Sequence, residues 1–91
     1  MQTAAGVIVV DEGKILAIRH SHTPYLSLPC GMVEPGETPA KAALREAAEE
    51  TGLPLELTGE APYVSFDAIA HREVHMFRAR AAGGKLRGSA E

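Results

Sequence analysis

The chain has 91 residues, of which 45% are hydrophobic and 23% charged. This length allows one small domain, and the composition is close to that of globular proteins, which argues against a disordered tail or a fibre. The single cysteine excludes an internal disulfide and a four-cysteine zinc site. The net charge of −3 argues against a surface that coats nucleic acid.

The hydropathy pattern predicts a cytoplasmic protein that does not enter a membrane. No apolar run approaches the roughly 18 residues of a membrane span. No basic region precedes the apolar stretch that ends at Val10, so a secretory signal is not expected.

The first third of the chain predicts a β-hairpin followed by a long loop. Residues 6–10 are apolar and β-branched, and residues 11–13 form a turn into a returning strand over residues 14–19. Residues 20–37 contain three prolines and two glycines, so we expect a long loop there, with a short strand at 26–28. Loops of this length in a small domain are often functional.

Residues 39–51 give the clearest helix signal. Thr38 is a suitable N-cap, Pro39 suits the first helical position, and Gly52 is a natural stop. At about 100° per residue, small or aliphatic side chains share one face that can lie close against a sheet. These are Ala40, Ala43, Leu44, Ala47 and Ala48.

The rest of the chain predicts strands over residues 55–57, 62–66 and 73–81, the last ended by Gly83 and Gly84. Residues 85–91 carry no fold signal of their own. One helix among several strands indicates an α/β or α+β fold.

An acidic face covers the second half of the predicted helix. Glu46, Glu49 and Glu50 lie within one turn near the helix C-terminus, where like charges and the helix dipole both disfavour carboxylates. A hard divalent cation such as Mg²⁺ or Mn²⁺ would compensate this charge. The alternative is a solvated acidic face that Arg45 and Lys41 offset.

The spacing upstream of the helix favours the cation. The chain has Gly31, five residues, Glu37, seven residues and then Arg45-Glu-Ala-Ala-Glu-Glu-Thr-Gly-Leu53. This pattern resembles the Nudix box, Gly-x5-Glu-x7-Arg-Glu-U-x-Glu-Glu-x-Gly-U, where U is a bulky aliphatic residue. The one departure is Ala47, which is apolar but smaller than the pattern asks.

The resemblance implies an α/β/α sandwich around a mixed β-sheet, with residues 1–91 as a single Nudix domain and the box at 31–53. Domains of this family continue with a further strand and a C-terminal helix. We therefore expect this chain to lack those elements as a C-terminally truncated domain, or to complete its sheet in a homodimer.

The resemblance also assigns roles to residues of the box. The implied metal ligands are three carboxylates and a backbone carbonyl: Glu46, Glu50, Glu49 and Gly31. The implied catalytic residues are Glu49 as a provisional general base, Arg45 as an orienting partner, and Glu37 as a ligand through water or a partner of Arg45.

The activity that the resemblance implies is hydrolysis of the pyrophosphate bond of a nucleoside diphosphate linked to another moiety, with Mg²⁺ or Mn²⁺ as cofactor. A small nucleotide is the expected substrate, and nucleoside triphosphates, ADP-ribose, dinucleoside polyphosphates and capped RNA all stay open. The alternative is a non-catalytic Nudix domain that binds nucleotides or other proteins.

A few residues outside the acidic helix are secondary candidates. Arg19 ends a predicted strand and is as well suited to a phosphate contact as to a solvated position. Tyr25 and Phe66 are candidates for stacking on a base, although the low aromatic content favours a core position for both. His75 could line a pocket. Cys30, where the family usually has glycine, is expected to be a small packed side chain.

Overall fold

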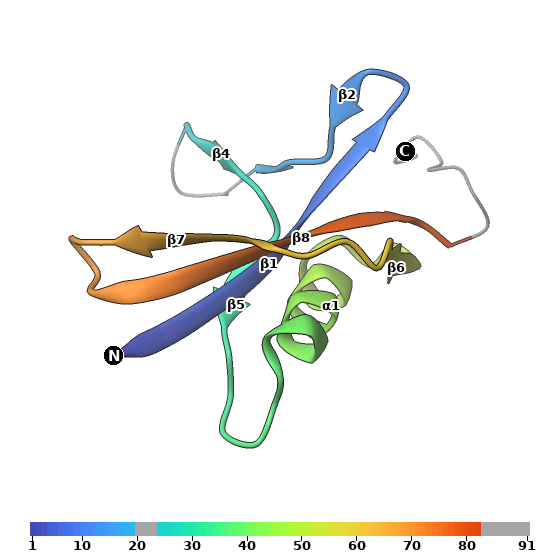
Figure 1. The fold of residues 1–91 in the computed structure, drawn as a ribbon. Coiled ribbons are helices and arrows are strands. Elements are labelled where there is room, and N and C mark those ends of the chain that lie inside the picture. Colours follow the sequence, from blue (N-terminus) through green and yellow to red (C-terminus); the bar gives the residue numbers. More distant parts are fainter. Residues whose placement is uncertain (20–23, 83–91) are drawn as a thin grey trace.

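The computed structural model describes residues 1–19 and 24–82. Within these residues a mixed sheet has the strand order β2-β1-β8-β6, with β5 also on β1 and β7 also on β8, and β3 and β4 form a separate pair (Figure 1). The elements are β1 Gln2–Asp11, β2 Lys14–Ile15, β3 Ile18–Arg19, β4 Leu26–Ser27, β5 Cys30–Met32, α1 Pro39–Thr51, β6 Leu55–Leu57, β7 Tyr63–Asp67 and β8 Arg72–Ala81. The predicted α/β fold with a mixed sheet is confirmed.

The two longest strands, β1 and β8, lie side by side at the centre of the sheet. They run parallel, in a register that pairs Gln2 with Arg72 and Val9 with Ala79. The first strand therefore starts four residues before the predicted residues 6–10. Its polar first residues, Gln2 and Thr3, carried no strand signal, and pairing with β8 extends it.

The predicted returning strand over residues 14–19 is interrupted. Its first part, β2, pairs with the end of β1, and the Leu16 N–H still donates to the Val9 carbonyl at 3.0 Å. The chain then leaves the main sheet, and Ile18 in β3 pairs with Ser27 in β4. The hairpin prediction is confirmed only as far as Ile15.

The prediction of an uninterrupted loop beyond residue 28 was wrong, because residues 30–32 form β5. This strand pairs antiparallel with β1 and places Gly31 opposite Ala5. Pro29 and Gly31 signalled a loop, yet the buried Pro29 directs its carbonyl to the Val7 N–H at 3.0 Å. A proline needs no donor for that contact, so it fits beside a strand.

The helix is confirmed at both ends. Thr38 accepts a hydrogen bond from the Lys41 N–H at 3.2 Å, and Gly52 takes the left-handed conformation, with a φ of 67°, that ends the helix. None of the described segments forms a helix with the length and apolar character needed to cross a membrane. The predicted glycine stop at 83–84 and the tail at 85–91 lie outside the described residues.

The face of α1 that packs on the sheet differs from the predicted one. Ala42, Ala43 and Ala47 are fully buried, whereas Ala48 is exposed. The three buried alanines lie against Ala5, Val7, Val9 and Ala79 of the central strands. The buried face is therefore turned toward the acidic face, and the two meet at Glu46.

The expectation that Tyr25 and Phe66 fill the core was wrong. The two residues are 71% and 53% exposed. The core between helix and sheet consists of alanine and valine, with Phe77 packed at its margin. Alanines bring the helix so close to the sheet that rings do not fit between them.

The close approach of α1 to the sheet predicts a position-specific response to added volume. Ala47→Leu should destabilise the fold by about 1–3 kcal/mol, because the buried site has no room for the extra methyl groups. Ala48→Leu adds the same atoms to the neighbouring exposed position and should be nearly neutral. Urea unfolding of both variants measures the difference. Equal unfolding midpoints would contradict the packing described above.

Candidate functional site

A tight turn places Glu37 ahead of the helix. The Glu37 N–H donates to the Glu34 carbonyl, and the Glu34 N–H donates to Glu37 Oε1, both at 3.0 Å. Gly36 provides the positive φ of 81° that the turn requires. The Glu37 side chain is thereby fixed at both ends of the turn and directed toward α1.

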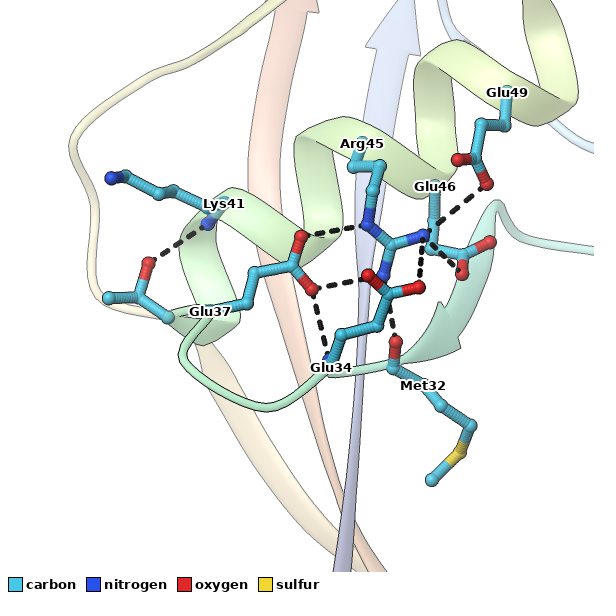
Figure 2. Close-up of polar contacts among 8 residues, drawn as sticks. Met32, Glu34, Glu37, Lys41, Arg45, Glu46 and Glu49 are labelled. Carbon is cyan, nitrogen blue, oxygen red and sulfur yellow. Dashed lines mark hydrogen bonds and ion pairs between the residues drawn. The ribbon is translucent and has the colours of Figure 1, made fainter.

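Arg45 is the centre of the site (Figure 2). Its Nε donates to Glu37 Oε2 at 2.7 Å and its Nη2 donates to Glu37 Oε1 at 3.0 Å, so the two side chains form a bidentate, two-pronged ion pair. Nη2 also donates to the Met32 carbonyl at 2.9 Å. The guanidinium thus ties the helix to the turn before it and to the end of β5.

The remaining nitrogen of Arg45 contacts three more carboxylates. Nη1 donates to Glu46 Oε2 at 3.0 Å and to Glu49 Oε1 at 3.4 Å, and it lies 3.8 Å from Glu34 Oε2. These ion pairs raise the pKa of Arg45, chiefly through the bonds to Glu37. In return, the bonds from Arg45 and from the Glu34 N–H lower the pKa of Glu37.

Glu46 lies in the narrow space between α1 and β5. Gly31 faces the helix, because its partner across the sheet, Ala5, belongs to the helix–sheet core. A Cβ atom on Gly31 would coincide with the Glu46 carboxylate. The missing side chain of Gly31 is therefore what leaves room for Glu46, whose side chain is only 16% exposed.

Glu50 is the carboxylate that Arg45 does not reach. Its Oε1 accepts a hydrogen bond from the Cys30 N–H at 3.2 Å. Burial raises the pKa of Glu50, and so do a hydrogen bond with Glu46 and the charge of Glu46. Two carboxylates this close disfavour each other's charge, and only Glu46 is paired with Arg45, so Glu50 is the part of the site with uncompensated negative charge.

The structure brings together the residues that the box pattern singled out. Glu37 and Arg45 form the predicted pair, Arg45 contacts Glu49 as well, and Glu46 lies between Arg45 and Glu50. Within residues 1–19 and 24–82, no three acidic, imidazole or thiol groups converge as a ready-made metal site.

Backbone groups complete the site, and sequence reasoning missed them. The Met32 carbonyl and the Cys30 N–H fix Arg45 and Glu50, but neither group depends on a side chain that a motif could specify. No role in the site was predicted for Glu34 either. Its spacing of three residues from Glu37 is the signal that would have indicated the turn.

The secondary candidates lie in different places. Arg19 is exposed in β3, and within the described part of the chain it makes no hydrogen bond or ion pair with the acidic residues of the site. Cys30 is half-buried, and burial raises the pKa of its thiol, which fits a packed side chain. A pocket of about 370 Å³ lies beside the turn and is lined by Met1, Gln2, Thr3, Met32, Val33, Glu34 and Pro35.

The contact of Gly31 with Glu46 predicts a clash that can be relieved. Gly31→Ala should cost about 1–3 kcal/mol of unfolding free energy, because its methyl group overlaps the carboxylate. In a Glu46→Ala background the same change should cost much less. A double-mutant cycle by urea unfolding measures this coupling, and additive effects would contradict the overlap.

The lowered pKa of Glu37 predicts an acid-dependent loss of stability. The native carboxylate takes up a proton less readily than in the unfolded chain, where its ordinary value is 4.5. The stability that Glu37 adds to the folded protein is therefore fully present above that value, and it disappears as the pH falls through the lower native pKa.

Glu37→Gln should lower the melting temperature most near neutral pH and least in strong acid. Glu60→Gln, at an exposed carboxylate that accepts from the neighbouring Thr58 hydroxyl, is the matched control and should change little at any pH. Melting curves across the acid range measure both. A deficit of the Glu37 variant that stays constant with pH would refute the assignment.

Comparisons with known proteins bear on this site. The model of the NUDIX domain matches residues 1–91. A MutT-like protein of Streptomyces ambofaciens is 37% identical over 98% of this chain and 57% of its own length. An ADP-ribose pyrophosphatase of Bacillus subtilis is 36% identical over 82% of this chain and 43% of its own length.

A solved structure agrees with these relatives. The NUDIX hydrolase from Nitrosomonas europaea is similar with a TM-score of 0.74 and 30% identity, over 89% of this chain and 47% of that one. The chain spans about half the length of the curated relatives it matches. With a family model that matches every residue and a box whose acidic side chains gather around Arg45, the chain belongs to the NUDIX family.

Proposed function

We propose that this chain acts as a metal-dependent pyrophosphohydrolase, which cleaves the pyrophosphate bond of a nucleoside diphosphate linked to another moiety. The observation that carries the proposal is that Glu46 lies against Gly31 and Glu50 accepts from the Cys30 N–H, so that both carboxylates lie beside the backbone of β5. This pair has more negative charge than its surroundings compensate. The names of the relatives, among them a pyrophosphatase, support the same reaction.

The donor set fits a hard divalent cation such as Mg²⁺ or Mn²⁺. Glu46 and Glu50 supply adjacent carboxylate oxygens, and oxygen is the ligand type that these ions prefer. Glu49 is exposed and its bond to Arg45 is long, at 3.4 Å, so it is the proposed third carboxylate ligand. The Gly31 carbonyl, on the strand that Glu46 contacts, is the proposed backbone ligand.

A divalent ion bound there would lower the pKa of an attacking water and neutralise charge on the phosphate oxygens. The residues of the chain prepare the site for that ion. Arg45 fixes one oxygen of Glu46, and the Cys30 N–H fixes one oxygen of Glu50. Both carboxylates are thereby oriented before any ligand arrives, which reduces the reorganisation that binding requires.

Glu37 and Arg45 act as positioning residues in this proposal. The two-pronged ion pair holds the turn at residues 34–37 against the helix, and Arg45 in turn orients Glu46 and Glu49. Glu49 is also the proposed general base, because it is the most exposed carboxylate of the helix that contacts Arg45.

The test uses purified protein with and without Mg²⁺ on nucleoside triphosphates, ADP-ribose and dinucleoside polyphosphates, with products resolved by chromatography. Glu50→Gln keeps the shape of the side chain and removes its charge. We expect its turnover to fall by about 100-fold or more, because even groups that merely orient a metal ligand change activity by 10–100-fold.

Glu60→Gln is the control for a lost carboxylate and should keep full activity, since Glu60 lies outside the site. Circular dichroism confirms that both variants fold. Nucleotide binding without turnover on any compound would overturn the proposal and favour a non-catalytic binding domain.

A further inference from the structure

Strand β7 is an open edge of the sheet. It pairs with residues 72–76 of β8, and β1 lies on the other side of those residues (Figure 1). Among residues 1–19 and 24–82, no further strand pairs with β7. A strand with a single neighbour presents a row of backbone N–H and C=O groups along its free side. The free side of β7 can therefore accept another strand.

The edge at β7 has none of the usual features that keep other strands away. Tyr63, Val64 and Phe66 are 64%, 55% and 53% exposed. Edge strands are commonly protected by lysine, by proline or by a bulge, and the five residues of β7 pair with β8 without interruption and contain neither residue type. Only the last of them, Asp67, is charged.

The charge of Asp67 is used within its own hairpin. Its Oδ1 accepts hydrogen bonds from the N–H groups of Ile69 and Ala70, both at 3.1 Å, and its Oδ2 lies 3.5 Å from Arg72 Nε. The carboxylate is therefore partly compensated before another strand arrives. Ile69 in the turn is fully exposed, so the apolar surface of β7 continues to the tip of the hairpin.

The residue order of β7 is complementary to itself. When two copies of the strand run antiparallel about Ser65, each Val64 is opposite Phe66 of the second copy. Each Tyr63 is then opposite Asp67, and no two like charges face each other. Pairs of an aromatic and a β-branched residue are favourable across strands. This is the only register in which all five residues of both copies are paired.

We propose that a second copy of this chain pairs with β7 as an antiparallel strand, with a two-fold axis at Ser65. A two-fold axis uses the same surface on both copies, so the assembly closes as a dimer. Val64 is on the helix-facing side of the sheet, since it is opposite His75, which is opposite Ala5 of the core. Residues opposite each other share a face, so the dimer has one continuous sheet with both α1 helices on the same side.

The size of this interface indicates a reversible dimer. An aromatic residue that becomes fully buried removes about 150–250 Å² from water, and Tyr63 and Phe66 have roughly half of their surface left to bury. Five residues per copy therefore bury on the order of a few hundred Å², less than the roughly 800 Å² per partner of a standard stable interface. The dimer should form at high concentration and dissociate on dilution.

Sedimentation velocity of the full chain, without metal or nucleotide, tests the association. We expect the mass to rise from that of one chain toward that of two between about 5 and 500 μM, because a small interface gives an affinity at the weak end of the range. A mass that stays at one chain throughout would overturn the inference.

Charges at the proposed axis test the register. Ser65→Lys and Ser65→Glu each place like charges directly opposite one another, so each should weaken the dimer by about 10-fold or more. An equal mixture of the two variants should associate again, because opposite charges then face each other. Circular dichroism confirms that both variants fold. A mixture of folded variants that stays monomeric would contradict the axis at Ser65.

Ile15→Lys is the matched control at another sheet edge. Ile15 is 59% exposed on β2, so the variant adds the same charge to an exposed edge position away from β7. It should dimerise like the unchanged chain. Loss of the dimer in Ile15→Lys, with Ser65→Lys still dimeric, would place the interface on β2 and overturn the proposal.

Disulfide cross-linking measures the register directly. Ser65→Cys places two thiols across the axis on Cα atoms about 4.5–5.5 Å apart, which a disulfide can span. Oxidised glutathione takes up the two electrons and two protons that the new bond releases. In Tyr63→Cys the two thiols are about 14 Å apart along the strands and should stay unlinked. The unchanged chain controls for Cys30, and equal cross-linking of both variants would refute the register.

None of these readouts depends on hydrolysis. A monomer that hydrolyses nucleotides would remove the dimer and keep the proposed function, whereas a dimer through β7 that hydrolyses nothing would do the reverse.

Discussion

The ion-pair network of Arg45 is the interaction on which the rest of the site depends. One guanidinium holds the turn at Glu37, the end of β5 at Met32 and two carboxylates of its own helix. Without a cation at this place, the acidic side chains would repel one another near the helix end that least favours them. Arg45 contacts Glu37, Glu46 and Glu49 but not Glu50, and the proposed metal site rests on this unequal distribution of charge.

The small residues of the core give this network its geometry. Alanines on α1 lie against alanine and valine on β1, so the helix approaches the sheet closely. At that distance an acidic side chain fits between the two layers only where the strand has none, and Gly31 supplies the gap for Glu46. The glycine and the carboxylate are thus one structural unit, although fourteen positions separate them in the sequence.

The sequence predicted the helix, its caps and the gathering of the box residues, because local spacing and side-chain chemistry determine them. It did not predict β5, the extension of β1 or the exposure of Tyr25 and Phe66. Those features depend on pairing between distant segments and on the thickness of the core, neither of which local patterns contain. The contacts of the Met32 carbonyl and the Cys30 N–H could not be predicted either, because backbone groups are the same in nearly every residue.

The parallel pairing of β1 with β8 has a consequence for how the chain acquires its fold. Residues 2–9 pair with residues 72–79, so the centre of the sheet joins the two ends of the described chain. During synthesis, β1, the box and its helix emerge well before β8. Until then one edge of the apolar strand β1 stays unpaired and open to other strands. Contacts this distant in sequence also slow folding, so the nascent chain has its longest exposure to chaperones and to aggregation after the box is made and before β8 arrives.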